Sequence, residues 1–334
     1  MVSAVIFVAT SCVSPLTGFA FWETNLAYEG ESIYNYLQVK NLSDRTILST
    51  NVLFGVQSVT MKDKGLTGMY YDTALAAPAL ADNANSALIL GMGTGTYARQ
   101  LKQYYPKMNI TGVEIDQKIT DLAGEYFDEP ADTPVTTYDG RAWLAASHDK
   151  YDVIMVDAYQ DITIPFQMSS TEFFTMVREH LNPGGVMVVN MNMISDGQGS
   201  INEALSDTIA SVFGNGNTLT ADVPNTTNRE LFAKKPGSGS EENSMQQASK
   251  ALNLRETTYE RTGSEDLEWY MEEVASRFRK VNEPDSASTI LTDDKAPVEV
   301  LGMHAIDQII ADEAGPYRQI LKDEGFGGLL RAVQ

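Results

Sequence analysis

The sequence predicts an α/β fold in which a parallel sheet is covered by helices on both faces and is preceded by a small antiparallel β unit. Three observations support this prediction. Apolar runs alternate with amphipathic segments from Leu88 onward, which is the pattern of parallel strands joined by crossover helices. A glycine-rich turn follows the first of these apolar runs. Residues 28–62 instead alternate with the two-residue period of half-buried strands.

The individual elements follow from the same patterns. In the β unit, the turn-forming residues 41–44 separate YNYLQVKNL from RTILSTNVLFGVQSVTMK and predict two strands. After a helical segment that begins near residue 72, the expected strands are 87–91, 109–114, 134–138, 151–157, 184–192, 217–222 and 229–234. The expected helices are 96–105, 117–127, 140–147, 169–181 and 199–213. The run Asn182-Pro183-Gly184-Gly185 ends one helix and turns the chain into a buried strand.

The chain divides into three parts. Its 334 residues are enough to bury a full core. We assign a hydrophobic segment to 1–22, the β unit to 23–75 and the sheet domain to 76–334. A polar insertion at about 235–290 fits a lid, an inserted helical hairpin or a partner surface. Residues 291–300 then return to the core, before a terminal helix within 304–333.

Residues 1–22 contain no charged side chain and have about the length of a membrane span. A secretory signal would carry basic residues at its start, and this segment has none. We therefore expect a membrane-anchoring helix, or the last helix of a larger membrane unit, and the alternative is a buried N-terminal segment.

The composition argues against two kinds of site. The formal net charge is -21, from 24 basic and 45 acidic residues, whereas nucleic-acid binding needs a basic surface. Such an acidic chain suits a cationic substrate, or simply has a solvated acidic surface. The single Cys12 and the scattered His148, His180 and His304 lack the spacing of a metal site. We expect no nucleic-acid partner and no metal.

Glycines and carboxylates follow successive strands of the predicted sheet. Ligands of open parallel sheets bind at the carboxyl ends of the strands, so the residues after each strand form one candidate site. These residues are Gly91, Gly93 and Gly95 of the first turn, then Glu114, Asp139-Gly140, and Asp157 through Asp161. An isolated aspartate at such a place is often an ordinary helix cap. Carboxylates at three successive strand ends favour a binding site.

The glycine spacing indicates the kind of nucleotide. Dinucleotide enzymes use G-x-G-x-x-G, whereas this turn has G-x-G-x-G, which fits an adenosyl-sulfonium cofactor better. Glu114 stands nineteen residues after Gly95 and can accept hydrogen bonds from a ribose diol. Asp139 can accept a hydrogen bond from the adenine amino group. The closing β unit at 217–234 is typical of Rossmann-like, class I methyltransferase-type sheets.

Five runs in the sequence carry a family resemblance: ALILGMGTGT, GVEID, YDGRAWL, YDVIMVDAYQDITIPFQMSSTEFF and LTDDKAPVE. Together they resemble the polyamine aminopropyltransferases, the spermidine synthase family. The similarity is to the divergent bacterial branch that carries membrane helices before the synthase domain. It covers most of residues 28–300 apart from the insertion. The resemblance implies transfer of an aminopropyl group from decarboxylated S-adenosylmethionine to an amine.

The resemblance also implies roles for matching residues. Asp157 would accept the proton of the attacking amine, Tyr70 would lie beside that amine, and Asp161 would bind the distal ammonium. Cofactor contacts would come from Glu114, Asp139, Gly140, Asn35, Gln57 and Tyr71.

For some of these residues a structural interpretation stays open. Tyr70 and Tyr71 also fit core aromatics, and Asp293-Asp294 fits a cap better than a substrate contact.

One position in the glycine turn departs from the family pattern. Family members usually have an aspartate there that anchors the aminopropyl ammonium, and this chain has Thr94. The change removes a charge-assisted hydrogen bond normally worth roughly 1.5–3 kcal/mol. Ordinary S-adenosylmethionine carries a carboxylate at this place, which Thr94 would tolerate better than an aspartate. By contrast, Ile89 stands where small-molecule methyltransferases have an acidic residue, as in the aminopropyltransferases.

Three functions stay open on these grounds. The first is a membrane-associated aminopropyltransferase acting on a small cationic amine such as putrescine, with a cytoplasmic catalytic domain and a homodimeric assembly. If the anchor is absent, we expect a cytoplasmic protein. The second is an S-adenosylmethionine-dependent methyltransferase acting on a small amine. The third is a non-catalytic ligand-sensing domain, and the retained Asp157 and Asp161 favour an enzyme over it.

Overall fold

A computed structural model describes residues 23–51, 56–158, 164–191, 199–237, 244–286, 288–303 and 322. The predicted anchor at 1–22 and nearly all of the predicted terminal helix lie outside these ranges. Within them, none of the helices is both long enough and apolar enough to cross a membrane.

The N-terminal unit is a four-stranded antiparallel sheet with strand order β1-β2-β3-β4. Its strands are β1 (Leu26–Glu31), β2 (Tyr36–Asn41), β3 (Arg45–Thr50) and β4 (Ser58–Met61). The predicted turn at 41–44 joins β2 to β3. The N-terminal unit has more strands than the two predicted, because no residue of β1 is fully buried and β4 is only 4 residues long. Such strands have little alternation to reveal them.

The main sheet has eight strands in the order β12-β10-β11-β9-β8-β5-β6-β7. They are β5 (Ser86–Leu90), β6 (Asn109–Glu114), β7 (Val135–Thr137), β8 (Tyr151–Val156), β9 (Leu181–Met191), β10 (Thr218–Asp222), β11 (Arg229–Lys234) and β12 (Arg279–Lys280). Strands β7, β6, β5, β8 and β9 run parallel, whereas β11, β10 and β12 are paired antiparallel. The α/β prediction is confirmed, and the antiparallel edge makes the sheet mixed.

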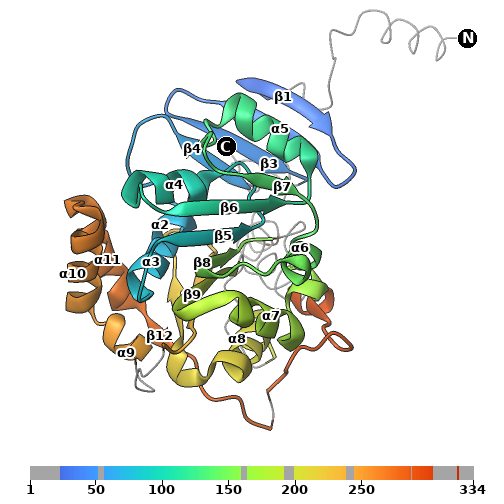
Figure 1. The fold of residues 1–334 in the computed structure, drawn as a ribbon. Helices are drawn as coiled ribbons and strands as arrows, with labels where there is room; N and C mark the ends of the chain where they lie inside the picture. The colour runs from blue at the N-terminus through green and yellow to red at the C-terminus, as the bar shows by residue number, and fades with distance from the viewer. Residues whose placement is uncertain are drawn as a thin grey trace, which may run out of the picture.

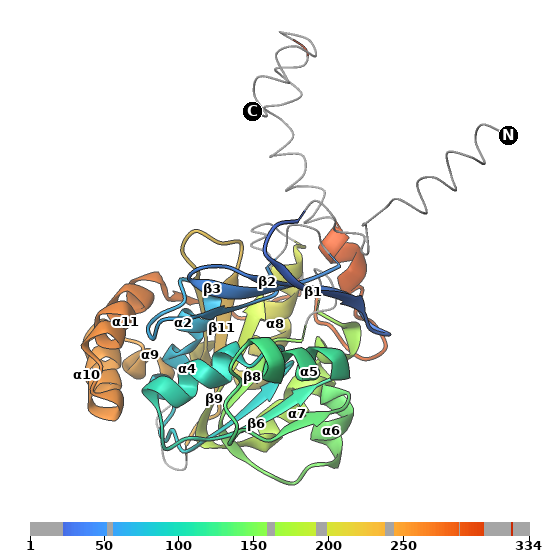
Figure 2. The same ribbon diagram turned by 90° about the horizontal axis from the view of Figure 1, so that it is seen from above.

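Helices cover both faces of this sheet (Figures 1 and 2). They are α2 (Tyr70–Ala74), α3 (Ala76–Leu80), α4 (Thr96–Tyr104), α5 (Gln117–Tyr126), α6 (Gly140–Ala146), α7 (Thr171–His180) and α8 (Ile201–Phe213). The sheet has two hydrophobic cores, and neighbouring residues of β5 belong to different ones. Ile89 packs with α2, α3 and α4, whereas Leu90 packs with α6, α7 and α8. A third cluster joins Leu37 and Leu48 of the N-terminal sheet to Leu122 of α5. This contact fixes the small sheet beside the strand ends of the large one.

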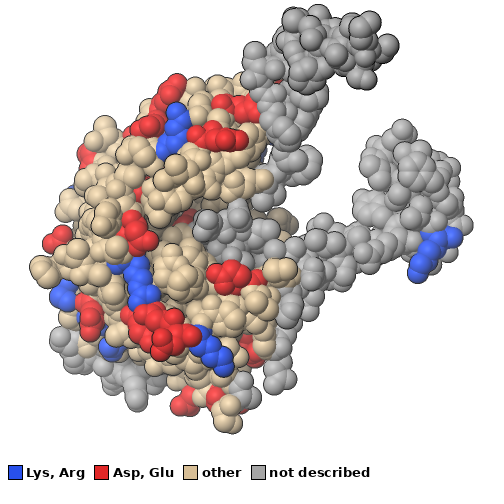
Figure 3. Space-filling view, turned by 90° about the vertical axis from the view of Figure 1, so that its right-hand side faces the viewer, with Lys and Arg blue, Asp and Glu red and all other residues tan. Residues whose placement is uncertain are grey.

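The insertion contributes α9 (Ser244–Ala248), α10 (Ala251–Thr262) and α11 (Glu265–Arg277). Helices α10 and α11 pack against each other at one edge of the molecule (Figure 1), so the helical-hairpin interpretation fits this segment. Leu291 and Val298 are buried, which confirms the predicted return to the core. On the face in Figure 3, basic and acidic side chains are interspersed and form no single basic patch.

Candidate active site

The carboxyl ends of β5, β6 and β8 border a cavity of about 310 Å³. Asn35, Leu48 and Gln57, which belong to the N-terminal unit, close one side, and Pro165 and Met168 line another. A cavity at this edge is where an open parallel sheet binds its ligand.

Gly91 allows the tips of β5 and β8 to meet. Its φ is +86°, and a Cβ at this position would lie 2.3 Å from the backbone oxygen of Asp157. Glycine alone tolerates both that φ and that close approach. The same turn makes Gly95 the N-cap of α4 and lets the N–H of Gly93 donate a 2.8 Å hydrogen bond to Glu114. The turn therefore connects three strand ends.

Glu114 lines the cavity at the end of β6 and is 7% exposed. One carboxylate oxygen accepts the bond from Gly93, and the other accepts a 3.0 Å bond from the N–H of Asp116. Burial raises the pKa of Glu114, and these backbone donors offset part of the effect. The carboxylate is thus held in one orientation at the cavity wall.

Asp139 and Gly140 line the cavity just beyond the tip of β7. Asp139 is also the N-cap of α6, where Oδ1 accepts a 2.8 Å hydrogen bond from the N–H of Ala142. The capping and cavity-lining interpretations of this residue are therefore compatible.

Asp157 follows β8 and is held on both oxygens. The hydroxyl of Tyr70 donates a 2.6 Å hydrogen bond to Oδ2, and Nδ2 of Asn190 donates a 2.9 Å bond to Oδ1. Asn228 donates a 2.8 Å bond to the side-chain oxygen of Asn190. Burial raises the pKa of Asp157 to about 7, although both direct hydrogen bonds lower it. An acid with this pKa can exchange a proton near neutral pH.

A second, smaller cavity of about 30 Å³ adjoins Asp157. It is lined by Tyr70, Asn190 and Asn228 among others, and it shares Gln57 and Asp157 with the larger cavity. The Asp157 carboxylate therefore borders both a space of nucleoside size and a small polar space.

Comparison with known proteins identifies the family. The Spermine/spermidine synthase domain matches residues 69–235. The chain is 99% identical over 334 residues to the probable polyamine aminopropyl transferase of Bifidobacterium longum (strain NCC 2705). The match covers 100% of this chain and 75% of that protein. This chain belongs to the spermine/spermidine synthase family.

Solved structures of spermidine synthases share its fold. The probable spermidine synthase from Corynebacterium glutamicum ATCC 13032 has a TM-score of 0.55 at 21% identity, over 80% of this chain and 99% of that one. A spermidine synthase in complex with the transition-state analogue AdoDATO has a TM-score of 0.54 at 18% identity, over 64% of this chain and 75% of that one. These comparisons confirm the predicted Rossmann-like, methyltransferase-type fold. The polyamine aminopropyltransferase family prediction and the transferase class are likewise confirmed.

Three predicted cofactor contacts lie on the N-terminal side of this synthase-family site. Asn35 lines the large cavity, and its Nδ2 donates a 3.0 Å hydrogen bond to Asp116. Tyr71 and Gln57 also line it, and the Tyr71 hydroxyl donates a 3.2 Å bond to the backbone oxygen of Gln57. The structure thus gathers these residues at one cavity, while their roles stay predictions.

The described residues that line the large cavity do not include Thr94 or Gly95, two of the predicted cofactor contacts. Thr94 is 1% exposed. Asp161 lies outside the described residues. The described part of the chain also contains no group of three His, Cys, Asp or Glu side chains that could hold a metal ion.

Sequence reasoning missed Asn190 and Asn228. Asn190 lies near the carboxyl end of β9, so a search of every strand end for polar residues of any kind would have found it. Asn228 precedes the antiparallel strand β11, and no local signal marks it.

Proposed function

We propose that this chain transfers the aminopropyl group of decarboxylated S-adenosylmethionine to a small diamine such as putrescine. One observation carries the proposal: Asp157, with a pKa raised to about 7, borders both cavities and is held by Tyr70 and Asn190.

The large cavity suits a cationic nucleoside. Glu114 would bind the ribose hydroxyls and Asp139 the adenine amino group, as their positions at successive strand ends support. Among the described lining residues there are three carboxylates, Glu114, Asp139 and Asp157, and no Lys, Arg or His. A ligand with a sulfonium and an ammonium is favoured in such surroundings, whereas the carboxylate of ordinary S-adenosylmethionine would meet no cationic side chain. This charge distribution favours aminopropyl transfer over methyl transfer, even with Thr94 in the turn.

The reaction needs an unprotonated amine. An aliphatic ammonium has a pKa of roughly 10, so one proton must leave before its nitrogen can attack. Asp157 would take that proton, the nitrogen would form a bond to the aminopropyl carbon, and the carbon–sulfur bond would break. The electron pair of that bond stays on sulfur, which leaves methylthioadenosine as a neutral thioether. Tyr70 and Asn190 would orient the Asp157 carboxylate during the transfer.

The small cavity suits the reacting end of the acceptor. Its amide side chains, Gln57, Asn190 and Asn228, are neutral, and Asp157 is the only anionic residue among the described residues that line it. The proposed contact of Asp161 with the distal ammonium lies outside the described residues.

An assay with both cofactors and both common acceptors tests the proposal. The purified chain would be incubated with decarboxylated or ordinary S-adenosylmethionine and with putrescine or spermidine. We expect aminopropylated product only with the decarboxylated cofactor, and a loss of kcat of about 100-fold or more in Asp157→Asn because general-base catalysis is removed. Methylated amine, or binding of only the carboxylated cofactor, would instead support the methyltransferase. Ligand binding without turnover, unchanged in Asp157→Asn, would support the sensor.

We also propose membrane association through residues 1–22, with a cytoplasmic catalytic domain, and a homodimer. Vesicle flotation of the full chain against a chain that begins at residue 23 tests the anchor. Sedimentation equilibrium of the shorter chain tests the dimer.

A further inference from the structure

Arg141 connects two walls of the large cavity. It follows Gly140, which lines the cavity, and its Nη1 donates a 2.7 Å hydrogen bond to the backbone oxygen of Gln167. Gln167 and Met168 line the adjoining wall. The two walls are close, since a Cβ on Gly140 would lie 3.6 Å from the Met168 methyl carbon. The Arg141 guanidinium therefore holds one wall against the other.

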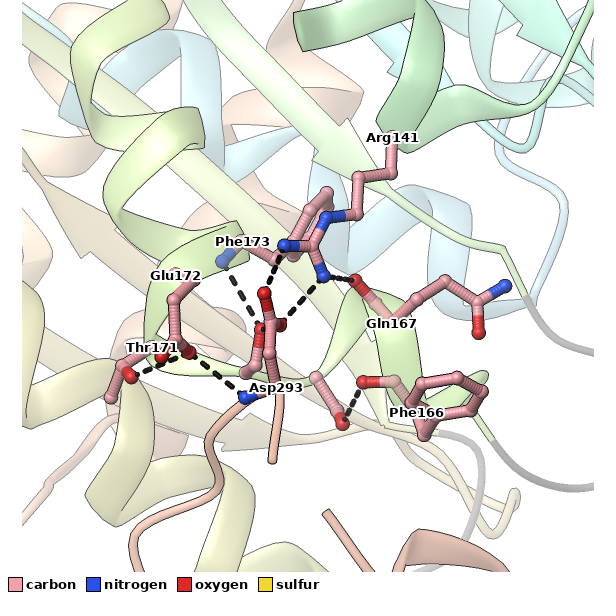
Figure 4. Close-up of polar contacts among 9 residues, drawn as sticks. Arg141, Phe166, Gln167, Thr171, Glu172, Phe173 and Asp293 are labelled. Atoms are coloured by element: carbon pink, nitrogen blue, oxygen red, sulfur yellow. Dashed lines mark hydrogen bonds and ion pairs between the residues drawn. The ribbon is translucent and has the colours of Figure 1, made fainter. Parts of the chain in front are cut away.

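Asp293 fixes that guanidinium. Its two oxygens accept hydrogen bonds of 2.7 and 2.6 Å from Nη1 and Nη2 of Arg141 (Figure 4). A third bond, of 2.5 Å, comes from the hydroxyl of Ser170, which is the N-cap of α7. Such two-point pairing orients a guanidinium in a way that a single contact does not. The hydrogen bond from Arg141 holds the pKa of Asp293 below its ordinary value, so this carboxyl is ionised at neutral pH.

The side chain of Gln167 points away from this cluster, while its backbone oxygen points toward Arg141 (Figure 4). The described residues that line the large cavity include neither Arg141 nor Asp293. Any effect of the pair on a ligand must therefore act through the wall at Pro165–Met168 and the strand end at Tyr138–Gly140.

We propose that Arg141, held by Asp293 and Ser170, is a positioning residue that fixes the width of the cavity beside Asp139 and thereby sets the affinity for the nucleoside end of the ligand. We call these three residues the Arg141 brace. The inference rests on the proposed function in assigning the adenine to this end of the cavity.

The chain offers a control pair of similar exposure, in which the arginine, Arg255, also pairs with Glu268. Arg255 of α10 and Glu272 of α11 form a pair with an N–O distance of 2.8 Å and side chains 23% and 46% exposed, against 21% and 42% for Arg141 and Asp293. This pair belongs to the helical hairpin, and neither of its residues lines the described part of the large cavity.

The test measures the binding of methylthioadenosine by calorimetry to the wild-type chain and to Asp293→Asn, Arg141→Lys and Glu272→Gln. Steady-state kinetics with both substrates and thermal unfolding accompany it. We expect the two brace variants to weaken nucleoside binding and to raise the cofactor KM about tenfold, while kcat and the amine KM stay within about twofold, because the brace positions a wall rather than the reacting atoms. Glu272→Gln should keep the nucleoside affinity even if its unfolding temperature falls as far as that of Asp293→Asn.

Several results would overturn the inference: unchanged affinity in Asp293→Asn, an equal loss in Glu272→Gln, a loss confined to kcat, or a wild-type chain that does not bind the nucleoside. A wild-type chain that binds the nucleoside but transfers no aminopropyl group would contradict the proposed function alone. In that case the nucleoside titrations of the variants still decide whether the brace acts as proposed.

Discussion

The hydroxyl of Tyr70 lies 2.6 Å from Oδ2 of Asp157 and donates a hydrogen bond to it. This bond stabilises the ionised carboxylate and so opposes burial, which is the larger effect and raises the pKa of Asp157 to about 7. Because the proposed reaction needs the ionised form of Asp157, activity should rise as the pH increases through this value.

The first prediction concerns Tyr70→Phe. Without the phenol, the charged form of Asp157 loses a hydrogen bond, so its pKa should rise by about one to two units. The acid limb of the kcat/KM profile should move to higher pH by that amount. Profiles from pH 5 to 9 measure the shift. The control Tyr105→Phe removes another buried hydroxyl and should leave the acid limb at the wild-type pH. If the acid limb of Tyr70→Phe also stayed at the wild-type pH, the assignment of Asp157 as the base would be contradicted.

The second prediction concerns Asn190→Ala. Asn190 donates to the other oxygen of Asp157, so its loss should lower kcat/KM at pH 7 about tenfold and move the acid limb in the same direction. Asn182→Ala is the matched control, because Asn182 donates a 2.8 Å bond to Asp152 at the opposite end of β8. That control should lower the free energy of unfolding by about 1 kcal/mol without changing the pH profile. If Asn190→Ala and Asn182→Ala had the same pH profile of kcat/KM, the loss of Asn190 would have changed only the stability of the chain.

The part of the site that could be predicted lies at the ends of parallel strands. Gly91, Glu114, Asp139 and Asp157 each follow an apolar run, and the geometry of a parallel sheet brings such positions together whatever their separation in sequence. The glycine spacing helped to locate the turn because the positive φ at Gly91 favours glycine, so the residue type itself marks the position. Local pattern was therefore enough for these residues.

Contacts between distant segments could not be predicted in this way. Arg141 and Asp293 are 152 positions apart, and no periodicity links them. Asp293-Asp294 was expected to be a cap rather than a substrate contact. Asp293 lines neither cavity, and its carboxylate pairs with Arg141 and accepts a hydrogen bond from Ser170. The pairing of Asn190 with Asn228 depends on the antiparallel register of β9 and β11, which the alternation of strands and helices does not specify.

The third prediction concerns Gly91→Ala. A Cβ would meet the backbone oxygen of Asp157 at 2.3 Å, and the φ of +86° adds backbone strain. Gly263→Ala separates these effects, since Gly263 has φ +65° with nothing within 4 Å of its Cβ. We expect Gly263→Ala to cost about 1 kcal/mol of unfolding free energy. Gly91→Ala should cost more and remove most activity, as urea titration and the transferase assay would show. Equal costs would mean that the turn can relax around the added methyl group.

The fourth prediction concerns Glu230, which is fully buried on β11 and whose carboxyl oxygens have no hydrogen-bond partner among the described residues. Burial raises its pKa well above the ordinary value, so above the unfolded pKa the folded state binds more protons than the unfolded state. The pKa of Glu230 is higher in the folded state than in the unfolded state. Stability is therefore lost as the pH rises from the unfolded pKa toward the folded pKa.

Glu230→Met removes this unpaired group and should raise the free energy of unfolding by about 1–3 kcal/mol, with a larger gain at pH 8 than at pH 5.5. Glu230→Gln keeps an unpaired polar group, so its gain at pH 5.5 should be small. Urea unfolding of the three chains at both pH values measures the difference. A Met variant less stable than the wild type at both pH values would show that the carboxyl has a stabilising partner, and the account of Glu230 as an unpaired acid would fail.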